Sequence, residues 1–234
     1  MIDFVALPAE GWRYRTQYKV RLGDVGPDGA LRLDGVARLL QDVATDDWDA
    51  VALNPDDNWV VRRTALRLVD GARWPRYKEP IVLTTWCAGV GAAWAERRTN
   101  IEVQGHVVLE ASALWVPIDV SGRPVRIGTA FMRIYGGTIQ GRKVPGRVRA
   151  PEVSPDAERR PWPLRRADLD VIGHINNAAI WQAITEVTGG TASYVEVIHL
   201  GSLEQGDEVT LLSTDRCVWL SVNGSVQVAA EFSA

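Results

Sequence analysis

The sequence matches itself at one constant, long spacing. An Arg-x-x-Asp pattern at Arg21–Asp24 returns 144 residues later at Arg165–Asp168, and the same offset pairs Gly29 with Gly173. Further along, it pairs apolar positions with apolar positions without a gap: Val36 with Ile180, Leu40 with Ile184, and Val43 with Val187. A match of this length predicts two copies of one supersecondary unit.

The residues after each glycine have the spacing of an amphipathic helix. Apolar side chains recur at i, i+3, i+4 and i+7 in both copies: Val36, Leu39, Leu40 and Val43, and then Ile180, Ala183, Ile184 and Val187. In the second copy Asn176 and Asn177 can cap the start of the helix, and Gly189-Gly190 follow its end. We therefore expect a helix at Asn176–Thr188 and a matching helix in the first copy.

Strand patterns follow each helix. The first set is Trp59–Val69, Ile81–Ala88, Ala93–Val103 and Val107–Ile118, and the second is Tyr194–Leu200, Val209–Leu220 and Ser225–Phe232. Turns are predicted at Gln104-Gly105 and Asn223-Gly224. One long helix followed by antiparallel strands, twice over, predicts an α+β fold of two tandem hotdog halves, each a long helix wrapped by a curled antiparallel sheet.

The predicted domain boundaries follow from a change in composition. Residues 141–163 are rich in Pro, Gly and Arg and show no periodicity, so they are predicted to be a linker. The N-terminal half then spans 1–140 and supplies wall and pocket, and the C-terminal half spans 164–234 and supplies catalysis.

Composition excludes several classes of protein. The formal net charge is −3, which argues against a nucleic-acid partner, and no apolar run is long enough to span a membrane. Cys87 and Cys217 are the only cysteines and lie in apolar stretches, so we expect two buried free thiols and no disulfide. No Cys/His spacing resembles a metal site, no cofactor is implied, and a cytoplasmic location is expected.

Polar chemistry concentrates in the segment Asp168–Asn177, directly before the second predicted helix. Asp170 can orient or deprotonate a water molecule, and His174 can transfer its proton. The unpaired N–H groups at the helix start can stabilise the oxyanion that forms when water attacks a thioester carbonyl. In the first copy Gly26 and Ala30 stand at the positions of Asp170 and His174, so we expect one active site per chain.

This segment resembles the D-L-D-V-N-Q-H-V-N-N motif of the acyl–acyl carrier protein thioesterase family, with Asp170, His174, Asn176 and Asn177 on matching positions. The stretches Leu40–Asp42, Trp59–Arg62, Pro75–Trp86 and Ala113–Val116 resemble the corresponding family segments in order. The resemblance implies a double hotdog that hydrolyses fatty acyl thioesters, with acyl carrier protein favoured over coenzyme A.

Two positions depart from the family pattern. Ile172 stands where the motif has an Asn, and the acid or thiol expected from the following strand is replaced by Ser202 or Glu204, depending on register. We predict Asp170, His174 and Asn176 as catalytic residues, and Asn177, Ser202 and Trp181 as substrate contacts. His199 and Trp48 are weaker candidates for the same site.

Some alternatives stay open at the level of sequence. A hotdog hydratase or dehydratase acting on enoyl or 3-hydroxyacyl thioesters also uses an Asp/His pair, and a non-catalytic acyl-binding module would tolerate Ile172. Arginine pairs at Arg62-Arg63, Arg97-Arg98 and Arg165-Arg166 could meet an acidic carrier protein, although scattered surface charge is the default interpretation. Either a monomer or a homodimer is compatible with two fused halves.

Overall fold

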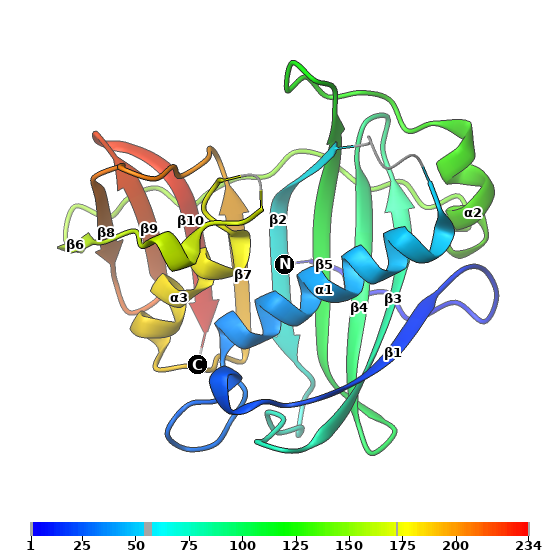
Figure 1. The fold of residues 1–234 in the computed structure, drawn as a ribbon, viewed down its shortest axis with the longest axis horizontal. Coiled ribbons are helices and arrows are strands. Elements are labelled where there is room, and N and C mark those ends of the chain that lie inside the picture. The colour runs from blue at the N-terminus through cyan, green and yellow to red at the C-terminus, as the bar shows by residue number, and fades with distance from the viewer. Residues whose placement is uncertain (1, 54–57, 172, 234) are drawn as a thin grey trace.

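A computed structural model describes residues 2–53, 58–171 and 173–233 of the 234-residue chain. These ranges contain three α-helices and one antiparallel sheet (Figure 1). The helices are α1 (Leu33–Val51), α2 (Thr129–Ile139) and α3 (Asn177–Thr188). The strands are β1 (Tyr14–Lys19), β2 (Asn58–Leu68), β3 (Pro80–Val90), β4 (Ala95–Val103), β5 (His106–Ile118), β6 (Glu158–Trp162), β7 (Tyr194–His199), β8 (Val209–Ser213), β9 (Cys217–Val222) and β10 (Ser225–Ser233).

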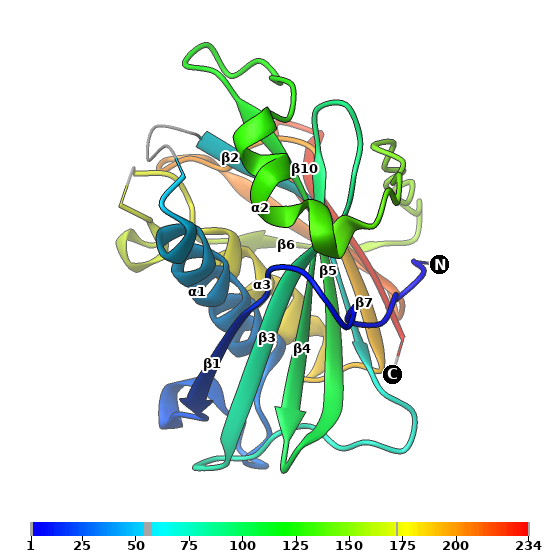
Figure 2. The same cartoon turned by 90° about the vertical axis from the view of Figure 1, so that its right-hand side faces the viewer.

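The sheet runs without interruption from one copy into the other. Its order is β1-β3-β4-β5-β2-β7-β10-β9-β8-β6, and β2 pairs with β7 through a register that includes Arg63 opposite Ile198 and Arg67 opposite Tyr194. The helices α1 and α3 pack against each other on the same face of this sheet (Figures 1 and 2). The main core lies between that face and the two helices.

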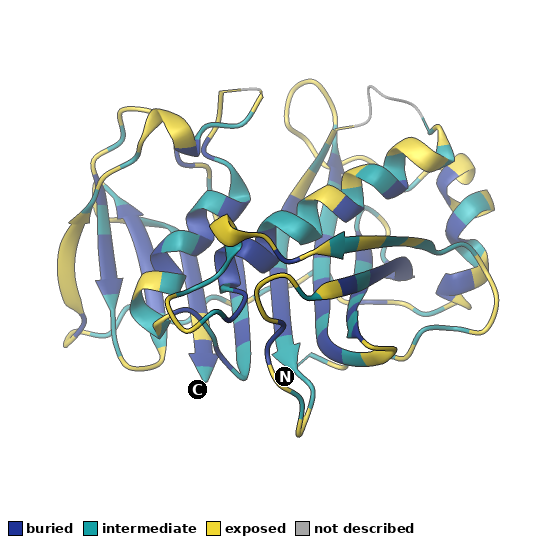
Figure 3. Cartoon of the chain, turned by 60° about the horizontal axis from the view of Figure 1, so that its bottom comes forward, coloured by how far each residue is buried: buried dark blue, intermediate teal, exposed yellow. Residues whose placement is uncertain are grey.

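The opposite face of the sheet is partly covered by chain without regular structure. The Phe4 ring lies against the guanidinium groups of Arg67 and Arg98, and the Trp219 indole N–H donates to the Pro151 carbonyl at 2.9 Å. Figure 3 shows buried residues continuing through the strands beneath the helices, while the outward sides of the helices are exposed. The face opposite the helices is only partly covered, since the Arg67 side chain remains 43% exposed.

The predicted internal repeat is present in the backbone. Each copy begins with a 3₁₀ turn, Leu22–Asp24 or Arg166–Asp168, and each turn is followed by a bridge, Val25 with Leu31 or Leu169 with Ile175. All of these positions differ by 144 residues, and Gly29 and Gly173 both adopt a positive φ, of 80° and 85°. The two copies therefore present α1 and α3 to the sheet through the same turn.

Several predicted boundaries are wrong. The predicted strand Val209–Leu220 is two strands, β8 and β9, because Thr214 turns the chain between them by accepting hydrogen bonds from the N–H groups of Arg216 and Cys217. The predicted linker ends in β6, which pairs with β8, and β1 and α2 have no counterpart among the predicted elements. The turns at Gln104-Gly105 and Asn223-Gly224 are confirmed, since all four residues have a positive φ.

Candidate active site

The loop that carries Asp170 and His174 is a tight hairpin-like turn before α3. The Asp170 N–H donates to the His174 carbonyl at 2.8 Å, and the His174 N–H donates to Asp170 Oδ1 at 3.0 Å. Asp170 is half-buried and His174 is exposed to solvent. The backbone thus fixes these two residues beside each other, whereas Ile172 lies outside the described residues.

Asp168 holds the base of this loop. Its carboxylate is buried, and it accepts hydrogen bonds from the Arg165 N–H at 2.8 Å and from the Arg165 guanidinium at 2.8 and 3.1 Å. The Asn176 N–H donates to the Asp168 carbonyl at 2.8 Å. These four hydrogen bonds close the turn, which gives Asp168 an architectural role.

Capping at the start of α3 leaves one backbone donor free. Asn176 Oδ1 accepts from the Ala178 N–H at 2.7 Å, and the Asn176 carbonyl accepts from the N–H groups of Ala179 and Ile180. No described residue accepts a hydrogen bond from the Asn177 N–H. This N–H lies at the positive end of the helix dipole, where an external acceptor could bind it.

Replacing Asn176 with alanine is expected to lower the free energy of unfolding by about 1 kcal/mol, because the cap on the Ala178 N–H is lost. Asn176→Asp keeps a carboxylate oxygen to accept that bond but removes the side-chain N–H donors. Urea denaturation of both variants measures the cap, and thiol release measures any further role. An Asn176→Ala protein as stable as the wild type would contradict the capping role.

A loop from the second half runs beside His174. Glu204 forms a β-bridge with His174, and the Ile175 N–H donates to the Leu203 carbonyl at 3.2 Å. Ser202 is exposed and lines neither of the two cavities described below, whereas Glu204 lies next to the turn that carries Asp170 and His174. Of the two sequence candidates for a strand residue, backbone register favours Glu204 over Ser202.

A small cavity of about 30 Å³ lies where α3 meets the sheet and α1. Asn177, Ala178 and Trp181 of α3 line it together with His199 of β7 and Arg97 of β4. Trp181 is buried, so the predicted contact residues Asn177 and Trp181 do face one common space. The start of α3 therefore borders the interior as well as the solvent.

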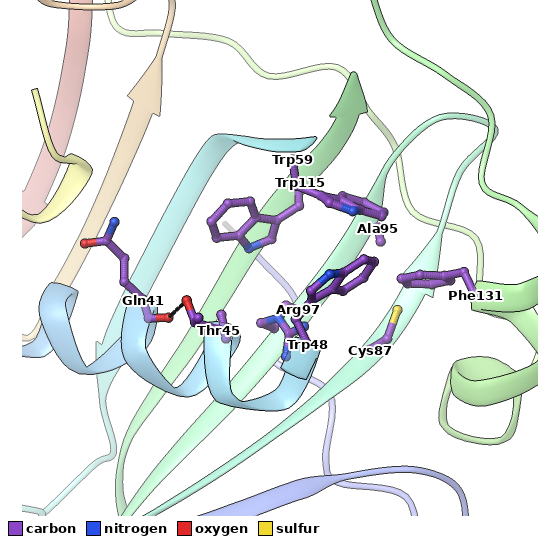
Figure 4. A pocket seen from close by; sticks show the side chains of 10 residues that line it. Gln41, Thr45, Trp48, Trp59, Cys87, Ala95, Arg97, Trp115 and Phe131 are labelled. Atoms are coloured by element: carbon purple, nitrogen blue, oxygen red, sulfur yellow. Dashed lines mark hydrogen bonds between the residues drawn. The ribbon is translucent and has the colours of Figure 1, made fainter. Parts of the chain in front are cut away.

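A larger cavity of about 240 Å³ continues between α1 and the sheet. The two cavities share three lining residues, Gln41, Arg97 and Trp115. Figure 4 shows Gln41 at one end and Phe131 at the other, with tryptophan side chains between them. The far end is aromatic: the Trp48 and Trp59 ring centroids are 5.7 Å apart, and those of Trp59 and Phe131 are 5.5 Å apart.

One buried ion pair lies in the wall of this space. Arg97 Nη1 donates to Asp47 Oδ2 at 2.6 Å, and Asp47, which is fully buried, also accepts from the Trp12 indole N–H at 2.7 Å and the Tyr135 hydroxyl at 2.9 Å. Burial alone would lower the pKa of Arg97, but the carboxylate of Asp47 outweighs it and raises that pKa. Arg97 therefore stays charged.

Cys87 lies in the same wall as a neutral thiol. Burial raises its pKa to about 12, so it carries no thiolate at physiological pH and does not act as a nucleophile. Both cysteines are free; Cys87 is buried as predicted, whereas Cys217 is only partly buried. Attack by water in place of a covalent cysteine intermediate is consistent with this environment.

His199 is a buried, neutral imidazole at the edge of the small cavity. Desolvation lowers its pKa to about 4, with a smaller contribution from the positive charge of Arg62. Its Nε2 has no hydrogen-bond partner among the described residues. Side chains of β7 alternate between the two faces of the sheet, so His199 lies on the helix-facing side with Val195 and Val197. No motif in the sequence indicated this position of His199.

His199 makes stability depend on pH in a defined direction. Its folded pKa is depressed, so its contribution to stability is complete above about pH 6.5 and is lost as the pH falls toward 4. The loss is at most roughly 3 kcal/mol, from 1.36 kcal/mol per pKa unit. Urea denaturation between pH 7 and 4 should show a smaller decline for His199→Leu than for the wild type, with exposed His106→Ala as the control. Equal declines in all three proteins would contradict this.

The pair Arg97-Arg98 forms neither a docking contact nor scattered surface charge, the two interpretations that the sequence left open. Arg97 faces the cavity and Arg98, which is 1% exposed, faces the opposite side of the sheet beneath Phe4. Successive residues of a strand point to opposite faces, so Arg97-Arg98 cannot form one surface patch. Arg165 remains on the surface, paired with Asp168.

No cluster of three or more His, Cys, Asp or Glu side chains suited to a metal ion occurs among the described residues. No helix in this part of the chain is long and apolar enough to cross a membrane.

Comparison with known proteins identifies the family. The acyl-ACP thioesterase N-terminal domain model matches residues 11–135. An uncharacterized protein of Mycobacterium tuberculosis is 26% identical, covering 90% of this chain and 86% of its own. The chloroplastic oleoyl-acyl carrier protein thioesterase 2 of Arabidopsis thaliana is 23% identical over 75% of this chain, which matches 54% of that protein's length.

Two solved structures have the same fold. The 12:0-ACP thioesterase from Umbellularia californica has a TM-score of 0.79 at 18% identity, covering 97% of this chain and 98% of its own. The acyl-ACP thioesterase from Bacteroides thetaiotaomicron has a TM-score of 0.76 at 17% identity, covering 94% and 97%. The fold is thus that of the hotdog thioesterases. Because the family model matches more than half of the chain, the protein belongs to the acyl-ACP thioesterase family of thioester hydrolases, as its sequence predicted.

Proposed function

We propose that this enzyme hydrolyses fatty acyl groups from acyl carrier protein, and that the bond is cleaved at the loop Asp170–Asn177. The observation that carries the site is the free Asn177 N–H at the start of α3, beside the Asp170–His174 turn and at the edge of the small cavity. An acyl chain lying in the two cavities would bring its thioester carbonyl to this helix end. Family membership favours the carrier protein over coenzyme A.

In the proposed reaction Asp170 orients a water molecule and accepts its proton as the oxygen attacks the thioester carbon. The Asn177 N–H stabilises the oxyanion of the tetrahedral intermediate. When the intermediate collapses, the carbon–sulfur bond breaks and His174 passes the proton that Asp170 took from water to the departing thiolate, so that both side chains return to their starting state. Water and thioester are converted to a free fatty acid and a free thiol, with no cofactor. Asn176 positions the helix start, and Trp181 and Glu204 contact the substrate or the loop.

The architecture belongs to the same proposal. Residues 1–140 and 164–234 form two tandem hotdog halves joined by 141–163, whose final strand β6 adds to the sheet of the second half by pairing with β8. The repeated 3₁₀ turn, bridge and helix support this division. In the first half Gly26 and Ala30 replace the catalytic pair, so that half supplies the acyl cavity. The cytoplasmic location and the choice between monomer and homodimer stay predictions.

The test is free-thiol release from matched acyl-carrier and acyl-CoA thioesters of several chain lengths. We expect release with a higher kcat/KM for the carrier-protein substrates. Equal or better use of coenzyme A thioesters would overturn the choice of carrier. A change in enoyl absorbance without free thiol would indicate the hydratase alternative, and tight binding without turnover would indicate an acyl-binding module.

A further inference from the structure

The wall that joins the two cavities carries an incompletely satisfied guanidinium. Arg97 Nη1 bonds to Asp47 Oδ2 and to Thr85 Oγ1 at 3.2 Å, while Arg97 Nε and Nη2 bond to none of the described residues. The Arg97 side chain is 15% exposed although it lies between α1 and the sheet, and it lines both cavities. Its remaining N–H groups therefore have free space rather than protein atoms beside them.

Other polar groups surround the same point. Thr64 and Thr99 line the small cavity, and Gln41 lines both. The indole N–H groups of Trp59 and Trp115 are buried in the wall without a partner among the described residues. This wall is rich in donors, whereas a saturated hydrocarbon chain offers no acceptor, so a plain acyl chain would leave the guanidinium N–H groups unsatisfied and displace water from them.

The charge of the wall is already balanced. Asp47 carries one negative charge against the one positive charge of Arg97, and burial raises the pKa of both Cys87 and Tyr135, which keeps those groups neutral. A charged carboxylate in the occupant would be left without a counter-charge in a dehydrated space, which is costly. A neutral acceptor oxygen satisfies the donors without that cost.

We propose, on the basis of the function proposed above, that the preferred acyl groups carry a neutral oxygen substituent, a hydroxyl or an oxo group, that accepts hydrogen bonds from Arg97. The aromatic end formed by Trp48, Trp59 and Phe131 holds the apolar remainder of the chain. Arg97 is then a residue that determines specificity for the substituent and takes no part in breaking the thioester bond.

The test compares dodecanoyl thioesters with isomers that carry one hydroxyl or oxo group at successive carbons. At least one oxygenated isomer should exceed the plain ester in kcat/KM by about tenfold or more, the effect of one well-placed hydrogen bond. In the double variant Arg97→Met with Asp47→Asn, which removes both charges together, this preference should fall to about one. Arg97→Lys keeps the charge and should retain only part of the preference.

The inference is overturned if no oxygenated isomer exceeds the plain ester, or if the folded double variant keeps the wild-type ratio. Should the double variant fail to fold, the Arg97→Lys ratio decides, since an unchanged ratio contradicts the role of the guanidinium N–H groups. If no thioester releases thiol, the proposed function has failed. Quenching of tryptophan fluorescence by dodecanoic acid and its hydroxylated isomers then tests the preference by itself: tighter binding of an isomer supports it, and equal binding overturns it.

Discussion

Replacing His174 with alanine is expected to lower kcat for thiol release by a hundredfold or more while leaving the fold intact. The His174 side chain is exposed and its structural bonds are made by its backbone, so alanine keeps the turn with Asp170. General acid–base catalysis contributes about 10²–10⁴-fold, which sets the size of the loss. Asp170→Asn keeps an oxygen for the His174 N–H and should reduce kcat by a similar factor.

The matched control is His106→Ala, which removes an exposed imidazole at the β4–β5 hairpin. It should release thiol at the wild-type rate. Circular dichroism and urea denaturation establish that all variants are folded. If His174→Ala keeps more than a tenth of the wild-type kcat, the loop is not the catalytic site and the buried imidazole of His199 becomes the next candidate.

Replacing Asp47 with alanine should produce the largest loss of stability, about 3–5 kcal/mol, because it leaves the Arg97 charge buried without its partner. The same carboxylate joins four parts of the chain, since Trp12 precedes β1, Tyr135 lies on α2, Arg97 on β4, and Asp47 itself on α1. For a chain of this size the melting temperature should fall by roughly 10 °C or more.

The control for this prediction is Asp49→Ala on the same helix, whose side chain is exposed and which should change stability by less than about 0.5 kcal/mol. Calorimetry and urea denaturation measure both variants. A loss below 1 kcal/mol for Asp47→Ala would mean that water reaches Arg97 and compensates its charge. Water would then enter the cavity wall although the side chains that form it are buried.

The repeated unit could be predicted from the sequence because the interactions that shape each copy join residues close together in the chain. The turn at Asp168, the cap at Asn176 and the helical spacing of Ile180 and Ile184 depend on residues within about one helix length. For the same reason the sequence could place Asp170 and His174 in one turn before α3, and their catalytic role stays a prediction. Family membership was predicted from that motif as well.

The cavity could not be predicted in this way. Arg97, Trp115 and Asp47 lie on separate elements and meet only when β4, β5 and α1 are packed together. His199 has no neighbouring motif, and its position facing Asn177 depends on the pairing of β7 with β2. The helix α2 was missed because Gly136 and Gly137 weaken its helical pattern, and packing of Phe131 and Tyr135 against β3 stabilises it.

The pairing of β2 with β7 has a consequence for how the molecule unfolds. Since this ladder joins the two copies and the main core is shared by α1 and α3, neither copy can lose its structure without exposing a strand edge and apolar surface of the other. Denaturation should therefore proceed as one cooperative transition. Either copy expressed alone would present an unpaired inner strand to solvent, and it should self-associate or aggregate through that edge.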